Sequence, residues 1–397
     1  MFKMSACGKV LPFLSQISRI FVHTPDFSKF RTDARFKRLD LDRLKSEAKI
    51  RDVVCLLEEL PDTKVLTTLT QLGVSLIVPT YVSIELPPNY YFTPYTSSLY
   101  PEPVRVYRVF PTFSGITRIK IYTRFDKYFY EVYQTLQPVL DKFRIPHQFC
   151  GTYFGTNTVT RLDDNTAYFF ISAPEVPVPL KGHNSPVILW YFEQPTSAYV
   201  NTDRTNGWFK FADILAAPWL QMQQNFFKEN PLRHSIWLPY RYSPSLTRLT
   251  EPMVKNIDIF FCGCPNPRRQ ALQQKLKSYP YDFVFTNEAF GEKLDEYILR
   301  SKIVLNLHFY PNAFLEVHRI NRMLAYDVCV VSEKSDDEAI DAIYANYVDF
   351  CDIETMPAYL GQMLRDDTWM EKSHRAQLFR QDMSENPTLM QLLEHLK

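Results

Sequence analysis

The sequence predicts an α/β protein in which the chain forms two parallel sheets with helices between the strands. Short, uninterrupted apolar runs recur along the chain and alternate with helix-periodic segments, a pattern typical of parallel strands buried on both faces. The runs form two series, separated by a polar connector that contains Pro239, Pro244 and Pro252. The length of 397 residues allows two domains of about 150 residues each and an N-terminal extension.

The first series of apolar runs begins after residue 115. Apolar residues recur at helical spacing from Phe129 to Phe143, and Pro138 predicts a kink in that helix. The runs around it have the length of buried strands. We expect strands at residues 119–122, 167–171, 187–192, 214–217 and 236–239.

The second series follows the connector and has the same character. The turn at 263–267 separates its first strand from its first helix. We expect strands at 257–262, 283–285, 303–307 and 328–331, and helices at 268–277, 292–299 and 313–326. The last 30 residues are polar and helix-periodic.

The N-terminal region is less regular. Residues 31–60 are charged and roughly helix-periodic, and residues 76–82 are expected to form a strand. Seven prolines lie from Pro79 to Pro111, with tyrosines between them. Because proline fixes φ and lacks an N–H donor, we expect this stretch to be irregular or extended, and not a central strand. Residues 1–110 are therefore set apart as a region of unknown role.

The composition excludes several classes of function. Lysine plus arginine number 45 against 44 acids, so the net charge of +1 creates no overall field that attracts nucleic acid or an anionic membrane. The chain has ten glycines, and none forms the usual glycine-rich dinucleotide or ATP loop. No apolar run reaches the roughly 18 residues of a transmembrane helix, so we expect no transmembrane segment.

The cysteines indicate a reducing, cytoplasmic environment. There are seven of them, scattered along the chain. Cys262 and Cys264 are spaced wrongly for a zinc knuckle or a redox dithiol. No second histidine or acid stands at metal-ligand spacing from His308, so we expect no metal site.

Polar residues gather where the strands of the second series end. Glu316 is expected about one turn into its helix, where the helix dipole favours a carboxylate and where its two oxygens suit the hydroxyls of a ribose. The alternative is that Glu316 only pairs with Arg319 at i+3 or only complements the helix dipole. His308 ends a strand, where a histidine is more often a hydrogen-bonded structural residue than a ligand contact. Asn312 lies in the turn that follows.

Two arginines mark a second candidate position. Arg268 and Arg269 stand at the start of a helix, directly after a turn rich in proline. Helix N-terminal amides and guanidinium groups together suit a diphosphate. The alternative is a solvated pair on a surface helix.

Two acids of the first series are candidate general bases. Glu193 ends an apolar strand, and Asp126 follows another. Either side chain is suited to proton transfer if it faces the crevice between the two sheets. Asp126 has an alternative role as the N-cap of the helix that follows it.

Several of these segments resemble the GT-B glycosyltransferases, and in particular the divergent "group 1" type of bacteria and large DNA viruses. The resemblance lies in the order of the Asn-Leu-His strand at 306–308, the Glu-x-x-Arg helix at 316–319 and the Val-Val-Ser-Glu strand at 330–333. Residues 190–194, Trp-Tyr-Phe-Glu-Gln, are similar to a segment of the first domain in those proteins, as are 212–215 and 238–240. The similarity extends over roughly residues 115 to 397 and leaves the N-terminal region unmatched.

This resemblance implies two Rossmann-like domains facing a cleft. Residues 111–245 would form an acceptor-side domain and 246–365 a nucleotide-sugar-binding domain, with helices at 366–397 packing back. The donor would be a nucleoside diphosphate sugar and the acceptor a saccharide or glycan, and no metal ion or other cofactor would be needed. Asp327 stands where family members usually have the glycine that ends the helix, a backbone shape that aspartate tolerates.

The resemblance also implies roles for the candidate residues. Glu316 would hold the donor ribose, while Arg268 or Arg269 with His308 would contact the diphosphate or the sugar. Arg319 and Asn312 would belong to the same donor site. Glu193 or Asp126 would act as the base if the reaction inverts configuration. Two alternatives remain, a nucleotide-sugar epimerase of the same fold and a non-catalytic nucleotide-sugar-binding protein.

Overall fold

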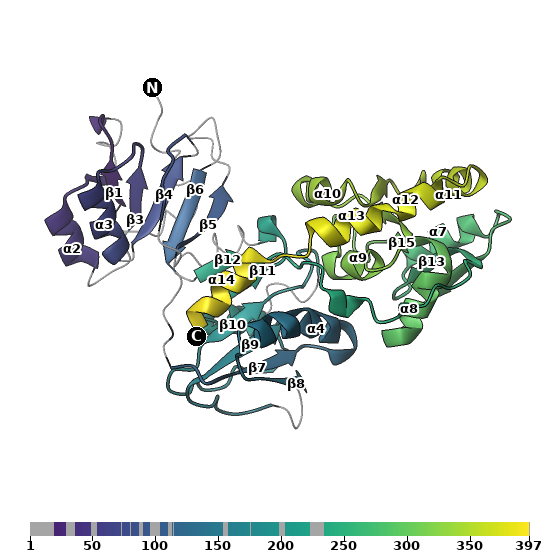
Figure 1. Cartoon of the computed structure of the whole chain (residues 1–397), viewed down its shortest axis with the longest axis horizontal. Coiled ribbons are helices and arrows are strands. Elements are labelled where there is room, and N and C mark those ends of the chain that lie inside the picture. The colour runs from purple at the N-terminus through teal and green to yellow at the C-terminus, as the bar shows by residue number, and fades with distance from the viewer. Residues whose placement is uncertain are drawn as a thin grey trace.

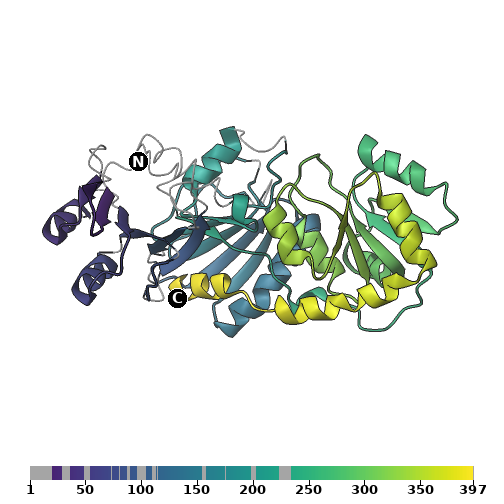
Figure 2. The same ribbon diagram turned by 90° about the horizontal axis from the view of Figure 1, so that it is seen from above.

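The computed structural model shows three successive α/β parts, each built around one sheet (Figure 1). Figure 2 shows the three parts in a row when the molecule is seen from above. The structure describes residues 20–28, 36–48, 54–72, 74–79, 81–86, 90–95, 104–109, 113, 115–153, 158–174, 176–197, 203–222 and 234–396.

The middle part contains six parallel strands in the order β12-β11-β10-β9-β7-β8. Its strands are β7 (Arg118–Thr123), β8 (His147–Thr152), β9 (Thr166–Ile171), β10 (Val187–Trp190), β11 (Ile214–Ala217) and β12 (His234–Trp237). Its principal helices are α4 (Asp126–Lys142) and α5 (Asp203–Phe211). Every residue of β9, β10 and β11 is buried, which explains why these runs are uninterrupted and apolar in the sequence.

The third part contains five parallel strands in the order β14-β13-β15-β16-β17. Its strands are β13 (Ile257–Cys262), β14 (Phe283–Thr286), β15 (Ser301–Asn306), β16 (Cys329–Glu333) and β17 (Asp349–Cys351). Its helices are α7 (Pro267–Leu276), α8 (Gly291–Arg300), α9 (Val317–Met323) and α10 (Glu338–Tyr344). The four strands expected here are present, within two residues at either end.

The two sheets share one topology. In each, the first strand lies between the second and the third, so β7 separates β8 from β9 and β13 separates β14 from β15. The chain therefore winds in one direction from the first strand and in the other direction from the third. Such a switch point opens a crevice at the carboxyl ends of the two central strands. In the third part the crevice lies beyond the ends of β13 and β15.

The C-terminal helices connect the third part to the middle part. They are α11 (Met356–Arg365), α12 (Thr368–Ser373), α13 (Arg375–Asp382) and α14 (Pro387–Leu396). In Figure 2 these yellow helices run along one side of the third part and return to the middle sheet. The buried leucines of α14 belong to the same core as β9, β10 and β11. Burial of each contributes about 1.5–3 kcal/mol, enough to hold this helix in place.

The N-terminal part is also an α/β unit, with the strand order β2-β1-β3-β4-β6-β5. Its elements are β1 (Ile20–His23), β2 (Phe36–Arg38), α2 (Leu41–Ala48), β3 (Val54–Leu57), α3 (Thr63–Gln71), β4 (Ser75–Pro79), β5 (Tyr90–Tyr95) and β6 (Val104–Val109). The proline-rich stretch was expected to be irregular or extended, but it supplies two regular antiparallel strands, and β6 is an interior strand. The expectation that no interior strand lies here is wrong. Pro94 is tolerated because β5 is the edge strand.

A buried cluster of charged side chains joins the middle and third parts. Arg322 of α9 pairs with Glu131 of α4 and, at 2.6 Å, with Asp295 of α8. Arg248 of the connector contacts the same two carboxylates, each at 3.2 Å. The side chain of Asp295 is fully buried and that of Arg322 is 1% exposed. Two cations and two anions therefore balance one another at the boundary between the sheets.

Candidate functional site

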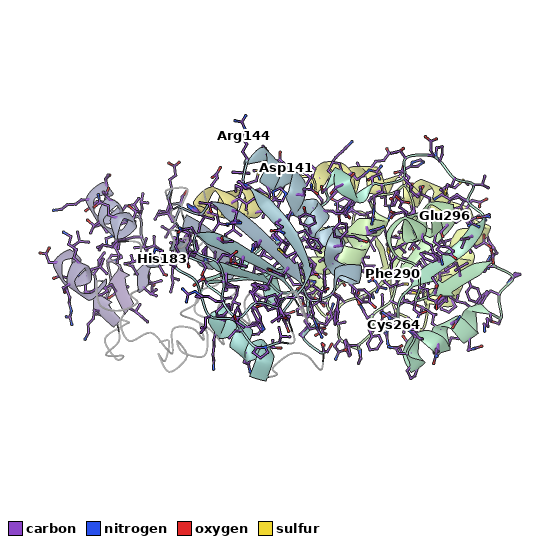
Figure 3. All side chains as sticks on the ribbon, turned by 90° about the horizontal axis from the view of Figure 1, so that it is seen from below. Asp141, Arg144, His183, Cys264, Phe290 and Glu296 are labelled. Carbon is purple, nitrogen blue, oxygen red and sulfur yellow. The ribbon has the colours of Figure 1, made fainter. Side chains whose placement is uncertain are left out.

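The candidate residues of the third part gather at its switch point. The loop 262–264 follows β13, the residues after Asn306 follow β15, and α7 and α9 begin beside them. Figure 3 shows Cys264 and Phe290 close together on the side of this part that faces the middle sheet. The ring of Tyr128 on α4 lies 5.6 Å from the ring of Phe290, so the middle part borders the site.

Glu316 is the N-cap of α9, not a residue within the helix. The helix was expected over 313–326 but covers only Val317–Met323. Asn312 adopts a left-handed backbone with φ of 54°, which ends the preceding turn and prevents helical geometry there. The expectation that Glu316 lies one turn into the helix is therefore wrong, although the residue is still at the N-terminal end of α9.

The Glu316 carboxylate is buried and fully engaged on one oxygen. Its Oε2 accepts a hydrogen bond of 3.0 Å from Asn306 Nδ2 and lies 2.8 Å from His308 Nδ1. Burial by itself would raise the pKa of Glu316, but His308, Arg319 and the Asn306 amide outweigh it and lower the pKa to about 2. Glu316 is therefore an ionised acceptor at neutral pH.

His308 holds Glu316 in position. Its Nδ1 faces the Glu316 carboxylate, its Nε2 lies 3.2 Å from the Lys334 carbonyl oxygen, and its backbone N–H donates to Glu333 at 3.1 Å. Acceptor oxygens thus face both ring nitrogens. The ring is 2% exposed. Its contacts are therefore those of a hydrogen-bonded structural residue, as the sequence indicated for His308.

The depressed pKa of Glu316 predicts a specific pH dependence of stability. The folded state holds this proton less tightly than the unfolded chain, in which the pKa is 4.5. The stabilisation is therefore complete above pH 4.5 and disappears as the pH falls towards 2. Glu316→Gln cannot titrate, so its free energy of unfolding should fall less over this window, by roughly 3 kcal/mol. Urea titrations at closely spaced pH values measure this difference. If the free energies of unfolding of the two proteins change in parallel with pH, the pKa of Glu316 is not lowered.

Arg268 pairs with an acid that ends β16. Its Nη1 donates to Glu333 Oε2 at 2.6 Å, and its Nη2 contacts the other oxygen of the same carboxylate. Nη1 also lies 3.4 Å from the His308 carbonyl oxygen. Arg268 is thus neither a solvated surface residue nor a free cation, since its charge is matched by Glu333.

Arg269 and Arg319 donate hydrogen bonds to backbone carbonyl groups near the ends of β13 and β15. Arg269 donates to the Cys264 carbonyl at 2.7 Å and to the Leu307 carbonyl at 2.5 Å, and Arg319 donates to the Cys262 carbonyl at 2.8 Å. Within the described ranges, neither makes an ion pair with a carboxylate. Burial, with Arg319 next in importance, lowers the pKa of Arg269 to about 10. Arg269 is 3% exposed and supports the loop from beneath, whereas Arg319 is partly accessible.

Gly263 allows the two arginines to converge. A β-carbon at this position would lie 3.1 Å from Arg319 Nη1, 3.2 Å from Arg269 Nη1 and 2.8 Å from the Phe261 ring. A larger residue would therefore clash with the Phe261 ring and crowd both guanidinium groups. The sequence indicated a turn here, but not that the turn packs against two cations.

Two other residues of this region have structural roles. Asn312 is exposed, and its left-handed backbone forms the turn, so its predicted donor contact has no support from its surroundings. Asp327 was expected in the left-handed shape that the family's glycine adopts, but it is not among the described residues with positive φ. Its carboxylate instead pairs with Arg380 of α13 at 2.7 Å, and this expectation is wrong.

The two candidate bases lie in the middle part, Glu193 after β10 and Asp126 after β7, with β9 between these two strands. Glu193 follows β10, and its Oε2 lies 2.5 Å from Arg124 Nη1. Asp126 is the first residue of α4, after the N-cap Phe125, so the expected alternative of an N-cap is wrong. The Asp126 side chain lies outside the described residues.

Three residues near the site were not singled out from the sequence. Gln194 and Trp219 bond to the backbone just before Glu316. His318 packs between Phe129 and Phe192, with each ring 6.1 Å away. Burial, then the charge of Arg319, lowers the pKa of His318 to about 4, so this ring is neutral at pH 7. Helical periodicity shows which face of a helix is apolar, but it does not show contacts between distant sheets.

In the part of the chain that the structure describes, no group of three or more histidine, cysteine, aspartate or glutamate side chains could hold a metal ion. None of the helices there combines the length and the apolar character that a membrane span requires.

The fold and the site together define a class. Two doubly wound parallel sheets follow one another, the last helix returns to the first of them, and polar residues collect at the switch point of the second. This is the GT-B architecture that the sequence predicted, with a further α/β unit at the N-terminus.

Comparisons with known proteins give only distant similarities. No protein family model matches the chain. The uncharacterized protein L140 of Acanthamoeba polyphaga mimivirus is 28% identical over 123 residues, which span 29% of this chain and 40% of that protein. The chain thus matches less than half the length of this relative.

Solved structures with a similar arrangement are far more distant in sequence. HepE of Anabaena, solved in complex with UDP and glucose, has a TM-score of 0.47 and 8% identity over 70% of this chain and 98% of its own. A mutant of S. aureus TarM, solved with fondaparinux, alpha-GlcNAc-glycerol and UDP, has a TM-score of 0.43 and 8% identity over 59% of this chain and 55% of its own. A shared shape does not imply a shared reaction.

Proposed function

We propose that the chain transfers a sugar from a nucleoside diphosphate sugar to a saccharide or glycan acceptor without a metal ion. One observation carries the proposal. An ionised, buried carboxylate, Glu316, stands at a switch point near two guanidinium groups, Arg269 and Arg319, that form no ion pair with a carboxylate in the described structure. A ribose and a diphosphate are neighbours in a nucleotide donor, and this pairing of charges suits them.

The arginines explain how the leaving group is stabilised in this proposal. When the bond between the anomeric carbon and the β-phosphate oxygen breaks, the electron pair leaves with the nucleoside diphosphate. Arg319 at the loop, the field of Arg269 beneath it and the N-terminus of α7 stabilise the developing charge. Charge held by fixed groups in a partly buried site is stabilised more strongly than in water.

The attacking group in this proposal is an acceptor hydroxyl. Its oxygen forms a bond to the anomeric carbon, and its proton passes to a base. In an inverting reaction Glu193 and Asp126 are the candidate bases, and both belong to the middle part. In a retaining reaction no protein base of this kind is required. The proposal therefore assigns the donor to the third part and the acceptor to the middle part.

A thermal-shift screen tests the donor site. The full chain is heated with UDP, GDP, dTDP and CMP sugars in the presence of EDTA. A ligand that binds only the folded state raises the melting temperature, and the stabilisation is about 2.7 kcal/mol at a hundred times its dissociation constant. At least one nucleotide sugar should raise the melting temperature of the wild type, and the shift should shrink in Arg319→Ala. If no nucleotide shifts the melting temperature, the donor site is wrong.

A non-catalytic nucleotide-sugar-binding protein is the second candidate. The pairing of Glu193 with Arg124 favours it, because that contact occupies one oxygen of a candidate base. A nucleotide-sugar epimerase of the same fold remains a further alternative. If nucleoside diphosphate is released only when an acceptor is present, glycosyl transfer is supported over both the binding protein and the epimerase.

A further inference from the structure

The segment 313–315, which leads into Glu316, is held by the middle part of the molecule. The Gln194 side chain makes two hydrogen bonds to Phe314, donating through Nε2 to its carbonyl at 2.9 Å and accepting from its N–H at 2.8 Å. The Trp219 indole N–H donates to the Leu315 carbonyl at 2.8 Å. Gln194 follows β10 and Trp219 follows β11, so all three bonds cross between the two sheets.

The packing around this segment is close. Ala313, Phe314 and Leu315 are at most 3% exposed, and the ring of Phe314 lies 5.8 Å from that of Trp219 in an edge-on arrangement. The third part itself bonds the segment at its start, where Asp336 N–H donates to the Ala313 carbonyl at 2.9 Å. The backbone from 313 to 315 is therefore fixed on both sides, by its own sheet and by the neighbouring one.

The contacts reach the start of α9 directly. The Leu315 carbonyl that accepts from Trp219 also accepts from the Val317 N–H at 2.8 Å. Glu316 lies between Leu315 and Val317 in the chain and has non-helical backbone angles, with φ of −73° and ψ of 72°. A backbone shift at Phe314 or Leu315 would therefore rotate the Glu316 carboxylate away from His308 and Asn306.

We propose that Gln194, assisted by Trp219, is a positioning residue for Glu316. Gln194 touches no donor atom in this account, and it acts by holding the backbone from which the ribose-binding carboxylate projects. The inference rests on the proposed role of Glu316. It has a consequence for the reaction, because the acceptor-side part then takes part in recognising the donor ribose.

Three variants separate this role from a general effect on folding. Gln194→Glu has the same shape and still accepts from the Phe314 N–H, but it places a carboxylate oxygen against the Phe314 carbonyl. Gln194→Ala removes both bonds, and Trp219→Phe removes the indole donor while keeping an aromatic ring. Gln148→Ala, at an exposed glutamine of β8, is the matched control.

The readout is the discrimination between a ribonucleotide and its 2′-deoxy form. Titration calorimetry gives the dissociation constants of UDP, 2′-deoxy-UDP, GDP and 2′-deoxy-GDP for the full chain. The wild type and Gln148→Ala should bind one ribonucleotide at least about tenfold more tightly than its deoxy form, since a hydrogen bond to a charged group is lost. In both Gln194 variants and in Glu316→Gln this ratio should approach one. Combining Gln194→Ala with Glu316→Gln should reduce it no further.

Two results would overturn the inference in different ways. If Gln194→Ala and Trp219→Phe weaken both forms of the nucleotide equally and keep the wild-type ratio, Gln194 only stabilises the boundary between the sheets. If the wild type binds none of the nucleotides of the thermal-shift screen, the proposed donor site fails and the inference fails with it. Should Gln194→Ala not fold, Trp219→Phe carries the same test.

Discussion

Glu316→Gln should weaken nucleoside diphosphate binding by about tenfold, and Glu316→Ala by about a hundredfold. The carboxylate is ionised, and the proposal has it accept the hydroxyls of the donor ribose. Glutamine keeps the shape but loses the charge and exchanges one acceptor for a donor. Alanine loses both acceptors and also leaves His308 and Asn306 without their shared partner. Titration calorimetry with UDP and GDP measures the loss.

The control for this prediction is Glu296→Gln. Glu296 lies on α8, its ion pair among the described residues is with Arg300 one helical turn away, and about half of its side chain is exposed. This variant should bind nucleotide like the wild type. If the wild type binds nucleotide and Glu316→Ala binds it equally tightly, the ribose assignment is wrong and the nucleotide lies elsewhere.

Arg322→Met should destabilise the folded chain by about 3–5 kcal/mol. Arg322 is buried between Glu131 and Asp295, and its removal leaves two carboxylates with only Arg248 to match them. Burial already raises the pKa of Asp295 despite both arginines. The boundary between the middle and third parts should therefore loosen first. Urea unfolding followed by tryptophan fluorescence measures the change.

A matched arginine and a rescue variant make this second prediction specific. Arg300→Met breaks the exposed pair with Glu296 and should cost less than about 1 kcal/mol. Adding Asp295→Leu to Arg322→Met removes one unpaired carboxylate and should recover part of the loss. A change below about 1 kcal/mol in Arg322→Met would mean that the charge cluster does not hold the two parts together.

The regular strands of the third part could be predicted from the sequence because burial on both faces leaves a continuous apolar run. The strand at 257–262 is predicted to the residue. The β8 strand was missed because His147–Thr152 is polar and partly exposed at the edge of the middle sheet. The β5 and β6 strands were missed because prolines dominate the local pattern, while pairing with β4 decides the outcome.

The place of the candidate site could be predicted from the sequence, but the contacts within it could not. The switch point follows from the order of strands and helices, so Glu316, His308 and the arginines could be placed near one another. Their partners could not, because Arg268 meets Glu333 from a strand 65 residues away. The start of α9, and with it the position of Glu316 as N-cap, was also missed. The segment before this helix is held by Gln194, which lies 120 residues from Phe314 in the sequence. Periodicity carries no information about such contacts.

The measurement that tests the central claim most directly is acceptor-dependent release of nucleoside diphosphate. The nucleotide sugar that most stabilises the full chain is incubated in EDTA with and without a mixture of saccharide acceptors, and the released nucleoside diphosphate is followed over time. The account predicts release that requires an acceptor, continues without metal and is lost in Arg319→Ala. A donor that binds tightly but is not turned over with any acceptor would contradict glycosyl transfer.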